Sequence, residues 1–181
     1  MNSTFFRLSG LCAALVAVTA CAADDTSTGW SVVNAGLRTH ASNKTWNDDV
    51  RVYGNGDMGY TLAYEYHNEA AFWQFLLDWT PDATGRADTD SALTPEVNLI
   101  FKDGWARAGL GVFDDIVSTT GGGGNDGWQN ITWQFLVGVG LPLGDRVTLD
   151  GYVHYPFAGW NRLDRFDFGD LEYSLALGFR F

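Results

Sequence analysis

The last eleven residues, Leu171-Glu172-Tyr173-Ser174-Leu175-Ala176-Leu177-Gly178-Phe179-Arg180-Phe181, alternate strictly between large apolar side chains and small or polar ones. All six odd-numbered positions carry Leu, Tyr or Phe, and none of the five even-numbered positions carries a large apolar side chain. Neighbouring side chains of a β-strand point to opposite faces, so a period of two indicates a strand. We therefore predict a terminal strand with one bulky apolar face and one small or polar face.

Seven further segments upstream repeat this alternation, and the first of them is the least regular. They span residues 30–38, 60–67, 73–79, 93–102, 106–112, 131–141 and 147–155. The connections alternate in length: long ones cover 39–58, 80–91, 114–127 and 156–170, and short ones lie near 68–70, 103–104 and 144–145. Long external loops and short periplasmic turns are typical of transmembrane barrels. We predict an all-β, eight-stranded antiparallel up-and-down transmembrane β-barrel over residues 23–181, with both termini on the periplasmic side.

The composition of the two faces indicates which one points outward. The small and polar face carries repeated Gly and Ala, such as Gly109, Gly111 and Gly138, which suit the crowded interior of an eight-stranded barrel. The other face is bulky, and aromatic residues near the strand ends match the girdles at the two membrane interfaces. The predicted membrane girdle consists of Tyr66, Trp73, Trp79, Phe101, Trp133, Tyr155 and Phe181.

The inward face also carries polar side chains of both charge signs. Because a lone buried charge is costly, we expect these acids and bases to pair inside the barrel as a plug of salt bridges. An eight-stranded barrel has an interior just wide enough for its side chains, which argues against an aqueous channel. The predicted lumen network consists of Glu65, Gln74, Asp78, Glu96, Asn98, Lys102, Arg107, Gln134, Asp150, His154, Glu172 and Arg180.

The overall composition excludes other classes of protein. The 181 residues carry a formal net charge of −11 at pH 7, which argues against nucleic-acid binding because that requires clustered Lys and Arg. Both cysteines, Cys12 and Cys21, lie near the start of the chain, so the remainder holds no disulfide framework and no cysteine metal site. No apolar run is long enough to indicate a transmembrane helix.

Residues 1–22 have the features of a secretory signal peptide. Arg7 precedes a short apolar core, and the small residues that follow suit cleavage after Ala22. A second interpretation stays open, because Val18-Thr19-Ala20-Cys21 resembles a bacterial lipobox in which Cys21 is lipidated and becomes the N-terminus. Either route exports the chain from the cytoplasm.

The signal peptide, the amphipathic strands and the terminal Leu-Ala-Leu-Gly-Phe-Arg-Phe together resemble bacterial outer-membrane β-barrels of the OmpA and OmpX kind. The resemblance implies the outer membrane of a Gram-negative bacterium, with outer-membrane lipids and lipopolysaccharide as partners. The C-terminal strand looks like the recognition signal that this class presents to the barrel-assembly machinery. The residues that would form this assembly signal are Tyr173, Leu175, Leu177, Phe179 and Phe181.

One group of inward residues could carry out hydrolysis. If a symmetric loop centred near Leu163 joins the last two strands, His154 faces Glu172 and Tyr152 faces Ser174. His, Glu and Ser are the components of a hydrolytic triad, and lipid A deacylases and phospholipases of this barrel class use His and Ser. No Ser follows His154 directly, as a lipid A deacylase pattern requires, and His154 and Ser174 point away from lipid. We therefore favour a stabilising His–Glu contact over a catalytic role for His154, Ser174 and Glu172.

The long connections are acidic. Their Asp residues are Asp88, Asp90, Asp114, Asp115, Asp126, Asp164, Asp167 and Asp170. Clustered carboxylates can bind Ca²⁺, but this spacing matches no EF-hand loop. We expect solvated anionic loops, without a bound metal and without a cofactor.

These observations favour a non-enzymatic outer-membrane barrel that supports envelope structure or binds partners through its acidic external loops. The alternatives are an outer-membrane lipid-modifying hydrolase, a periplasmic lipid-anchored barrel that binds a ligand, and a carrier of small solutes. The ligand-binding alternative requires the Trp and Leu face to line the interior. The oligomeric state is open, because a closed barrel has no strand edge that drives association.

Overall fold

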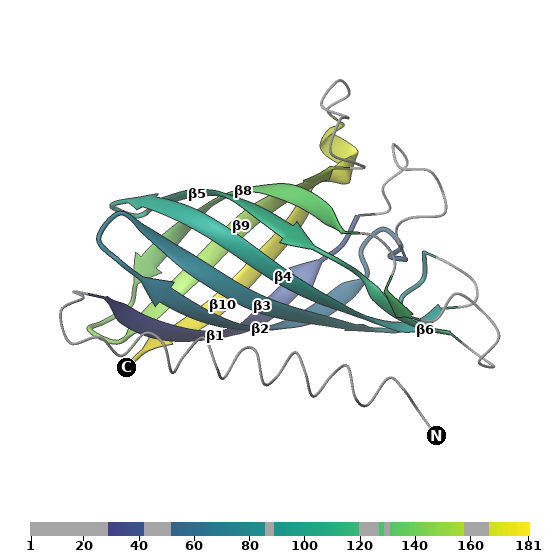
Figure 1. The fold of residues 1–181 in the computed structure, drawn as a ribbon, viewed down its shortest axis with the longest axis horizontal. Coiled ribbons are helices and arrows are strands. Elements are labelled where there is room, and N and C mark those ends of the chain that lie inside the picture. Colours follow the sequence, from purple (N-terminus) through teal and green to yellow (C-terminus); the bar gives the residue numbers. More distant parts are fainter. Residues whose placement is uncertain (1–28, 42–51, 86–88, 120–126, 129–130, 158–166) are drawn as a thin grey trace.

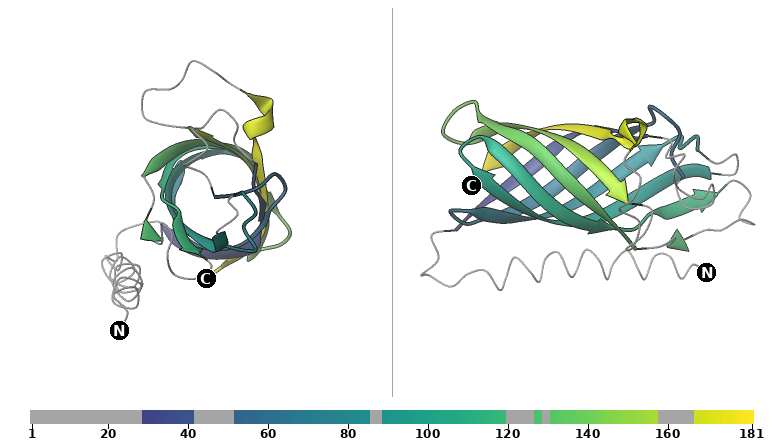
Figure 2. Two further views of the ribbon diagram at one scale, coloured as in Figure 1. Left: turned by 90° about the vertical axis from the view of Figure 1, so that its right-hand side faces the viewer. Right: turned by 90° about the horizontal axis from the view of Figure 1, so that it is seen from above.

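Eight long strands wind into a closed cylinder with tight turns at one end (Figures 1 and 2). The structure is a computed structural model, and it describes residues 29–41, 52–85, 89–119, 127–128, 131–157 and 167–181. The predicted signal peptide and the lipobox at Cys21 lie outside the described residues. No helix among the described residues is long and apolar enough to cross a membrane.

The strand order confirms the predicted up-and-down barrel. Its strands are β1 (Trp30–Thr39), β2 (Met58–His67), β3 (Ala71–Pro81), β4 (Thr89–Asp103), β5 (Ala106–Phe113), β8 (Thr132–Pro142), β9 (Val147–Phe157) and β10 (Glu172–Arg180). Each pairs antiparallel with its neighbours, in the order β3-β2-β1-β10-β9-β8-β5-β4, and pairing of β3 with β4 closes the ring. The final residue extends the pairing of β10 with β1, because the Phe181 amide donates to the carbonyl of Ser31 over 3.1 Å.

The last hairpin has the predicted register. His154 pairs with Glu172, and Tyr152 pairs with Ser174. A shift of one residue would turn every side chain of β10 to the opposite face. The alternation of the C-terminal strand and the length of the preceding loop were therefore sufficient to predict which residues of β9 and β10 are neighbours.

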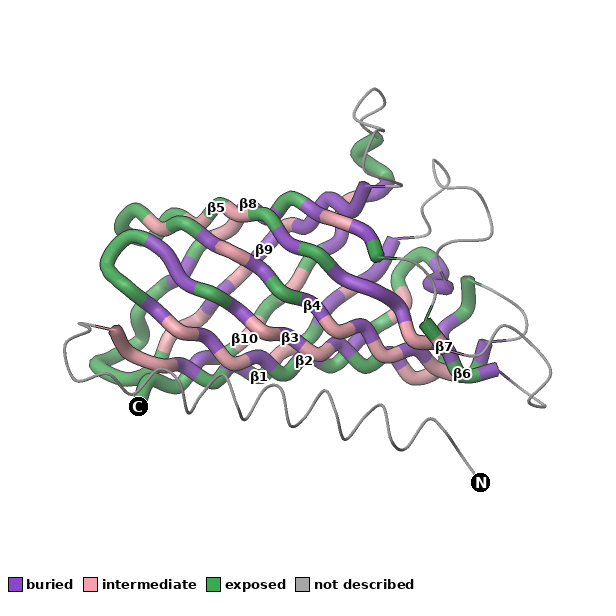
Figure 3. Tube along the Cα trace, in the orientation of Figure 1, coloured by how far each residue is buried: buried purple, intermediate pink, exposed green. Residues whose placement is uncertain are grey.

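Burial is inverted relative to that of a water-soluble barrel. On the outer face Leu62, Val137 and Leu175 are 55%, 57% and 57% exposed, whereas the inward Asn98 and Gln134 are 0% exposed. Figure 3 shows this alternation of buried and exposed positions along the strands. The faces therefore lie as the small-residue pattern predicted, and the ligand-binding alternative, which requires the Trp and Leu face inside, is wrong for the described strands.

Inward glycines leave room for the polar interior. A β-carbon at Gly111 would collide with the side-chain oxygen of Asn98 and lie 3.2 Å from Nε2 of Gln134. A β-carbon at Gly138 would collide with the main-chain oxygen of Gly151 on the neighbouring strand. Side chains at these two positions would therefore displace either the buried amides or the strand itself.

The loop end of the barrel is more ordered than the sequence predicted. The connection predicted at 114–127 contains two short strands, β6 (Ile116–Thr119) and β7 (Gly127–Trp128), and β6 pairs with the first residues of β4. Short strands beside Gly-rich sequence carry too little alternation to be recognised. The connection between β9 and β10 contains a 3₁₀-helix, η1 (Phe168–Asp170).

A loop segment also covers the loop end of the lumen. Val52 and Tyr53 are buried in a small apolar cluster with Ala83, Ala92 and Val117. The amide of Gly85 donates to the carbonyl of Val52 over 3.0 Å, which joins this segment to the connection that follows β3.

Candidate functional site

The loop side of the lumen is organised around Arg38, which is not among the lumen residues predicted from the sequence. Its guanidinium lies 2.7 Å from Oε2 of Glu172, contacts Oε1 of Glu96 and lies 3.9 Å from Oδ2 of Asp78. Its Nη2 also donates to Oε1 of Gln134 over 3.2 Å. These partners come from β10, β4, β3 and β8, so one side chain of β1 connects it with four other strands. We call Arg38, His40, Asp78, Glu96 and Glu172 the Arg38 cluster.

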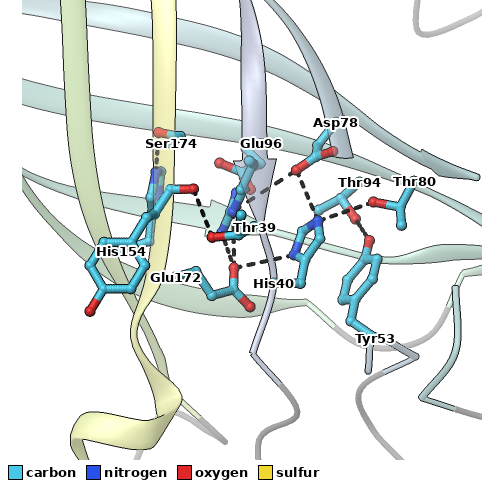
Figure 4. Close-up of polar contacts among 12 residues, drawn as sticks. Thr39, His40, Tyr53, Asp78, Thr80, Thr94, Glu96, His154, Glu172 and Ser174 are labelled. Carbon is cyan, nitrogen blue, oxygen red and sulfur yellow. Dashed lines mark hydrogen bonds and ion pairs between the residues drawn. The ribbon is translucent and has the colours of Figure 1, made fainter. Parts of the chain in front are cut away.

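His40, which follows the last residue of β1, adds a second basic side chain to the cluster. Figure 4 shows its ring between Asp78 and Glu172, and its nitrogens lie 3.2 Å and 3.4 Å from these carboxylates. Burial lowers the pKa of His40, but the charge of Glu172 and hydrogen bonds with Asp78 and Glu172 outweigh that effect and raise the pKa above its usual value. Arg38 and, when it is protonated, His40 thus face three carboxylates.

A chain of hydrogen bonds continues from the cluster toward the turn end. Gln134 donates to Glu96 over 2.8 Å and to Asn98 over 3.1 Å, and Asn98 donates to Gln74 over 2.9 Å. Gln74 in turn donates to Glu65 over 2.7 Å. The amide groups therefore act as polar linkers that satisfy buried carboxylates without adding charge.

The covering loop segment is bonded to the barrel wall. The Tyr53 hydroxyl contacts Thr94 on β4 and donates to Oδ1 of Asp115 over 3.3 Å, and the Tyr53 ring stacks on His40 with centroids 3.8 Å apart. Thr94 donates to the same Asp115 oxygen over 2.7 Å. Tyr53 thus fixes this loop to the Arg38 cluster.

The predicted lumen residues divide into two groups. Nine of them are buried: Glu65, Gln74, Asp78, Glu96, Asn98, Gln134, Asp150, His154 and Glu172. Lys102 and Arg107 are only half-buried and Arg180 is exposed, all three at the turn end. The expectation that these three cations pair with the buried acids is wrong for the described residues, since the ion pairs found there in the lumen use Arg38, His40 and His67 instead.

Three members of the network were missed in the sequence, and all three lie near the end of a strand or just beyond it. Arg38 belongs to the least regular strand, His40 lies just beyond it, and His67 ends the second strand. His67 Nε2 contacts Oε2 of Glu65 at 2.7 Å. Outward Val33 and Leu37 would have placed Arg38 on the inward face by phase. The inward Val32 in the same strand obscures that phase.

The alternative catalytic residues are only partly assembled. His154 Nε2 and Ser174 Oγ are 2.8 Å apart, as a nucleophile and its base would be (Figure 4). Glu172, however, contacts Arg38 and His40 through Oε2 and accepts from the amide of Ala41 through Oε1 over 3.5 Å. Both of its oxygens are engaged away from the orienting role that a triad carboxylate performs.

The predicted girdle residues lie on the outer face. Trp73, Trp79, Phe101 and Phe181 are exposed, and Tyr66 and Trp133 are half-buried. Tyr155 pairs with the exposed Phe135 and so shares this face, but it is buried because it packs against Phe157 with ring centroids 4.9 Å apart and its hydroxyl accepts from the amide of Asp167 over 3.3 Å. The proposed assembly residues all lie exposed on the outer face: Tyr173, Leu175, Leu177, Phe179 and Phe181.

The expectation of solvated loop carboxylates is wrong for three Asp residues. Asp114, Asp115 and Asp170 are buried, and Asp115 accepts from Tyr53 and Thr94. Asp88, Asp126 and Asp164 lie outside the described residues. Within the described part of the chain, no group of three or more His, Cys, Asp or Glu is arranged to hold a metal ion.

No family model and no curated protein sequence matches the chain. In its fold the chain is similar to Neisserial surface protein A (NspA), with 15% identity and a TM-score of 0.48 over 84% of this chain and 94% of NspA. It is also similar to Ail, the attachment invasion locus protein of Yersinia pestis, which was solved in complex with the heparin analogue sucrose octasulfate. For Ail the identity is 16% and the TM-score 0.46, over 84% of this chain and 99% of that one.

Proposed function

We propose that the chain is an integral outer-membrane barrel of a Gram-negative bacterium that does not conduct solutes and presents loops at the cell surface. The observation that carries this proposal is the inverted burial, with apolar side chains outside and an ionic network inside. Contiguous apolar surface on a water-soluble monomer rarely exceeds a few hundred Å². An apolar outer face on every strand of a closed barrel is instead suited to hydrocarbon, which provides no hydrogen bonds.

Aromatic residues support an orientation across the membrane. Trp73, Phe101 and Phe181 lie near the turn end of their strands, and Trp79 and Tyr60 lie near the loop end with ring centroids 6.0 Å apart. Two such bands match the interfacial girdles of outer-membrane barrels. In this arrangement the turns and the C-terminus face the periplasm, and the long loops face outward.

The interior supports a structural role and argues against a channel. The Arg38 cluster spans the lumen, and Tyr53 lies over it from the loop side. A solute would have to break ion pairs between fully buried groups, which costs several kcal/mol for each charge left unpaired. We therefore expect the membrane-spanning part to act as a rigid support, and partner binding to take place on the loops.

The decisive experiment is electrophoresis of isolated membranes in SDS, with samples boiled and unboiled. We expect a heat-dependent change in mobility, and retention of the protein in the membrane pellet after an alkaline wash. Release by the wash without a mobility change would overturn membrane insertion. Planar-bilayer recordings on the same material test the closed lumen, and steady conductance steps would contradict it.

A lipid-modifying hydrolase is the second candidate, supported by the 2.8 Å contact between His154 Nε2 and Ser174 Oγ. This candidate requires lipid to reach a serine on the inner face of β10. Lipid profiles of cells that overproduce the wild type, His154→Ala or Ser174→Ala distinguish the candidates. The hydrolase would be favoured if the wild type changes the lipid profile and both variants fail to do so while they keep the heat-dependent mobility of a folded barrel.

A further inference from the structure

Four basic side chains gather at the turn end of the barrel. The described residues include five Lys and Arg, and four of them, Lys102, Arg107, Arg146 and Arg180, line one cavity of about 200 Å³. The fifth, Arg38, is enclosed by carboxylates on the loop side of the lumen. Four cations around one cavity call for a specific explanation, because like charges repel one another.

Two of the acids that line the same cavity form their hydrogen bonds with groups other than these four cations. Glu65 accepts from Gln74 and contacts His67, both over 2.7 Å, and Oδ2 of Asp150 accepts from Thr148 over 2.7 Å. Asp145 lies in the exposed turn at the rim. Among the described residues, none of the four cations lies within ion-pairing distance of a carboxylate.

The cations are nevertheless held in defined positions. Lys102 Nζ lies 4.0 Å and Arg180 Cζ 4.5 Å from the centre of the Trp30 ring, which forms one wall of the cavity. Arg107 donates from Nη1 to the carbonyls of Gly104 and Ala106 over 3.1 Å and 3.3 Å, and its Nε is buried without a hydrogen-bond partner. Contacts with an aromatic face and with carbonyls orient these groups and leave their charge available.

We propose that this cavity binds a phosphate group. Three guanidinium groups supply planar pairs of N–H donors that match phosphate oxygens, and the ammonium of Lys102 adds a point charge. A doubly charged oxyanion is attracted to four cations more strongly than a carboxylate is, because the Coulomb energy scales with the charge of the anion. Since a water molecule takes up about 30 Å³ of liquid, the cavity has room for one phosphate and some of its hydration.

A phosphate group could reach this end of the barrel from two sources. In the proposed orientation the cavity opens toward the periplasm, where phosphate arrives as a small soluble phosphomonoester or as the headgroup of a lipid in the inner leaflet. The proposal concerns the phosphate group itself. It stands independently of the external loops, and the experiment separates the two sources.

The test is a titration of the full mature chain, folded in an uncharged maltoside detergent, with inorganic phosphate at constant ionic strength maintained with chloride. The readout is the indole N–H signal of Trp30 in a ¹H–¹⁵N correlation spectrum, assigned with Trp30→Phe. We expect a saturable shift of this signal. Arg107→Gln is expected to raise the dissociation constant for phosphate about tenfold, which corresponds to about 1.4 kcal/mol of binding free energy.

Two further variants distinguish phosphate binding in the cavity from a general effect of charge. Asp145→Asn removes a negative charge from the rim, so it is expected to strengthen phosphate binding. Asp82→Asn makes the same charge change next to the end of β3 at the loop end and is expected to leave binding unchanged; Asn also tolerates the positive φ of 55° at this position. Heat-dependent mobility in SDS gels verifies that each variant is folded.

A shift that does not saturate, or one that responds equally to Asp145→Asn and Asp82→Asn, would overturn the proposal in favour of general charge screening. An unchanged dissociation constant in folded Arg107→Gln would overturn it as well. Repeating the titration in nanodiscs with phosphatidylglycerol and with phosphatidylcholine separates the sources. Competition by phosphatidylglycerol would identify a lipid headgroup, and an equal response in both would identify a soluble phosphate.

Discussion

Arg38 on β1 and Glu172 on β10 are 134 residues apart in the chain, yet the guanidinium Nη2 lies 2.7 Å from the carboxylate Oε2 inside the barrel. Both side chains are 1% exposed. Their contact lies where the last strand pairs with the first, so it can form only when the barrel has closed in the correct register. The stability of the barrel should therefore depend strongly on this cluster.

We expect replacement of Arg38 by Met to destabilise the folded barrel by about 3–5 kcal/mol, because it leaves Glu96, Asp78 and Glu172 buried around a single remaining cation. Arg38→Lys should lose less, since it keeps the charge but not the forked geometry. The measurement is urea unfolding in detergent or lipid vesicles. Leu37→Ala, on the outer face of the same strand, serves as the control. An Arg38→Met barrel as stable as that control would refute a stabilising cluster.

Stability should also depend on pH through His40, whose pKa is raised in the folded state despite the opposing effect of burial. A raised pKa contributes stability that is fully present below the unfolded value of about 6.5 and is lost as pH rises through the folded value. The free-energy difference between wild type and His40→Gln should therefore shrink as pH increases above about 6.5. A difference that stays constant or grows with pH would contradict the assignment of a charged His40.

Two glycines provide a matched test of the crowded interior. Gly138 faces inward, and a β-carbon there would collide with the backbone of Gly151, whereas the nearest atom to a β-carbon at Gly151 is 3.8 Å away. We expect Gly138→Ala to reduce the yield of heat-modifiable barrel after refolding, and Gly151→Ala to leave the yield unchanged. Equal yields would show that the strands can shift to accommodate an inward methyl group.

The C-terminal strand permits a test of assembly in cells. Phe181 is 67% exposed on the outer face, and its amide is bonded to Ser31, so removal of its ring leaves the strand pairing intact. We expect Phe181→Ala to lower the fraction of protein that reaches the outer membrane, relative to Leu143→Ala, a change at an exposed turn residue. Fractionation followed by unboiled electrophoresis measures this fraction. Equal fractions would remove Phe181 from the proposed assembly signal.

The sequence by itself determined the strands, their number and the direction of their faces. Each follows from local alternation, since a period of two and a face of repeated Gly or Ala can be recognised without knowing which residues meet across the barrel. The register of β9 with β10 was also predictable, because one loop joins these two strands and its length restricts how they can align. Arg38 was missed because its strand has inward Val32 beside outward Val33, which obscures the phase.

The tertiary structure alone decided which inward residues meet. Residues that share a face can pair across the lumen only at the same height, and that height depends on the stagger of all eight strands around the closed ring. This stagger brings Arg38 to Glu96 and Glu172, and it leaves Lys102 and Arg180 beside Trp30 at the turn end. The sequence therefore showed that acids and bases face inward, but only closure of the barrel separated the Arg38 cluster from a positively charged cavity at one end.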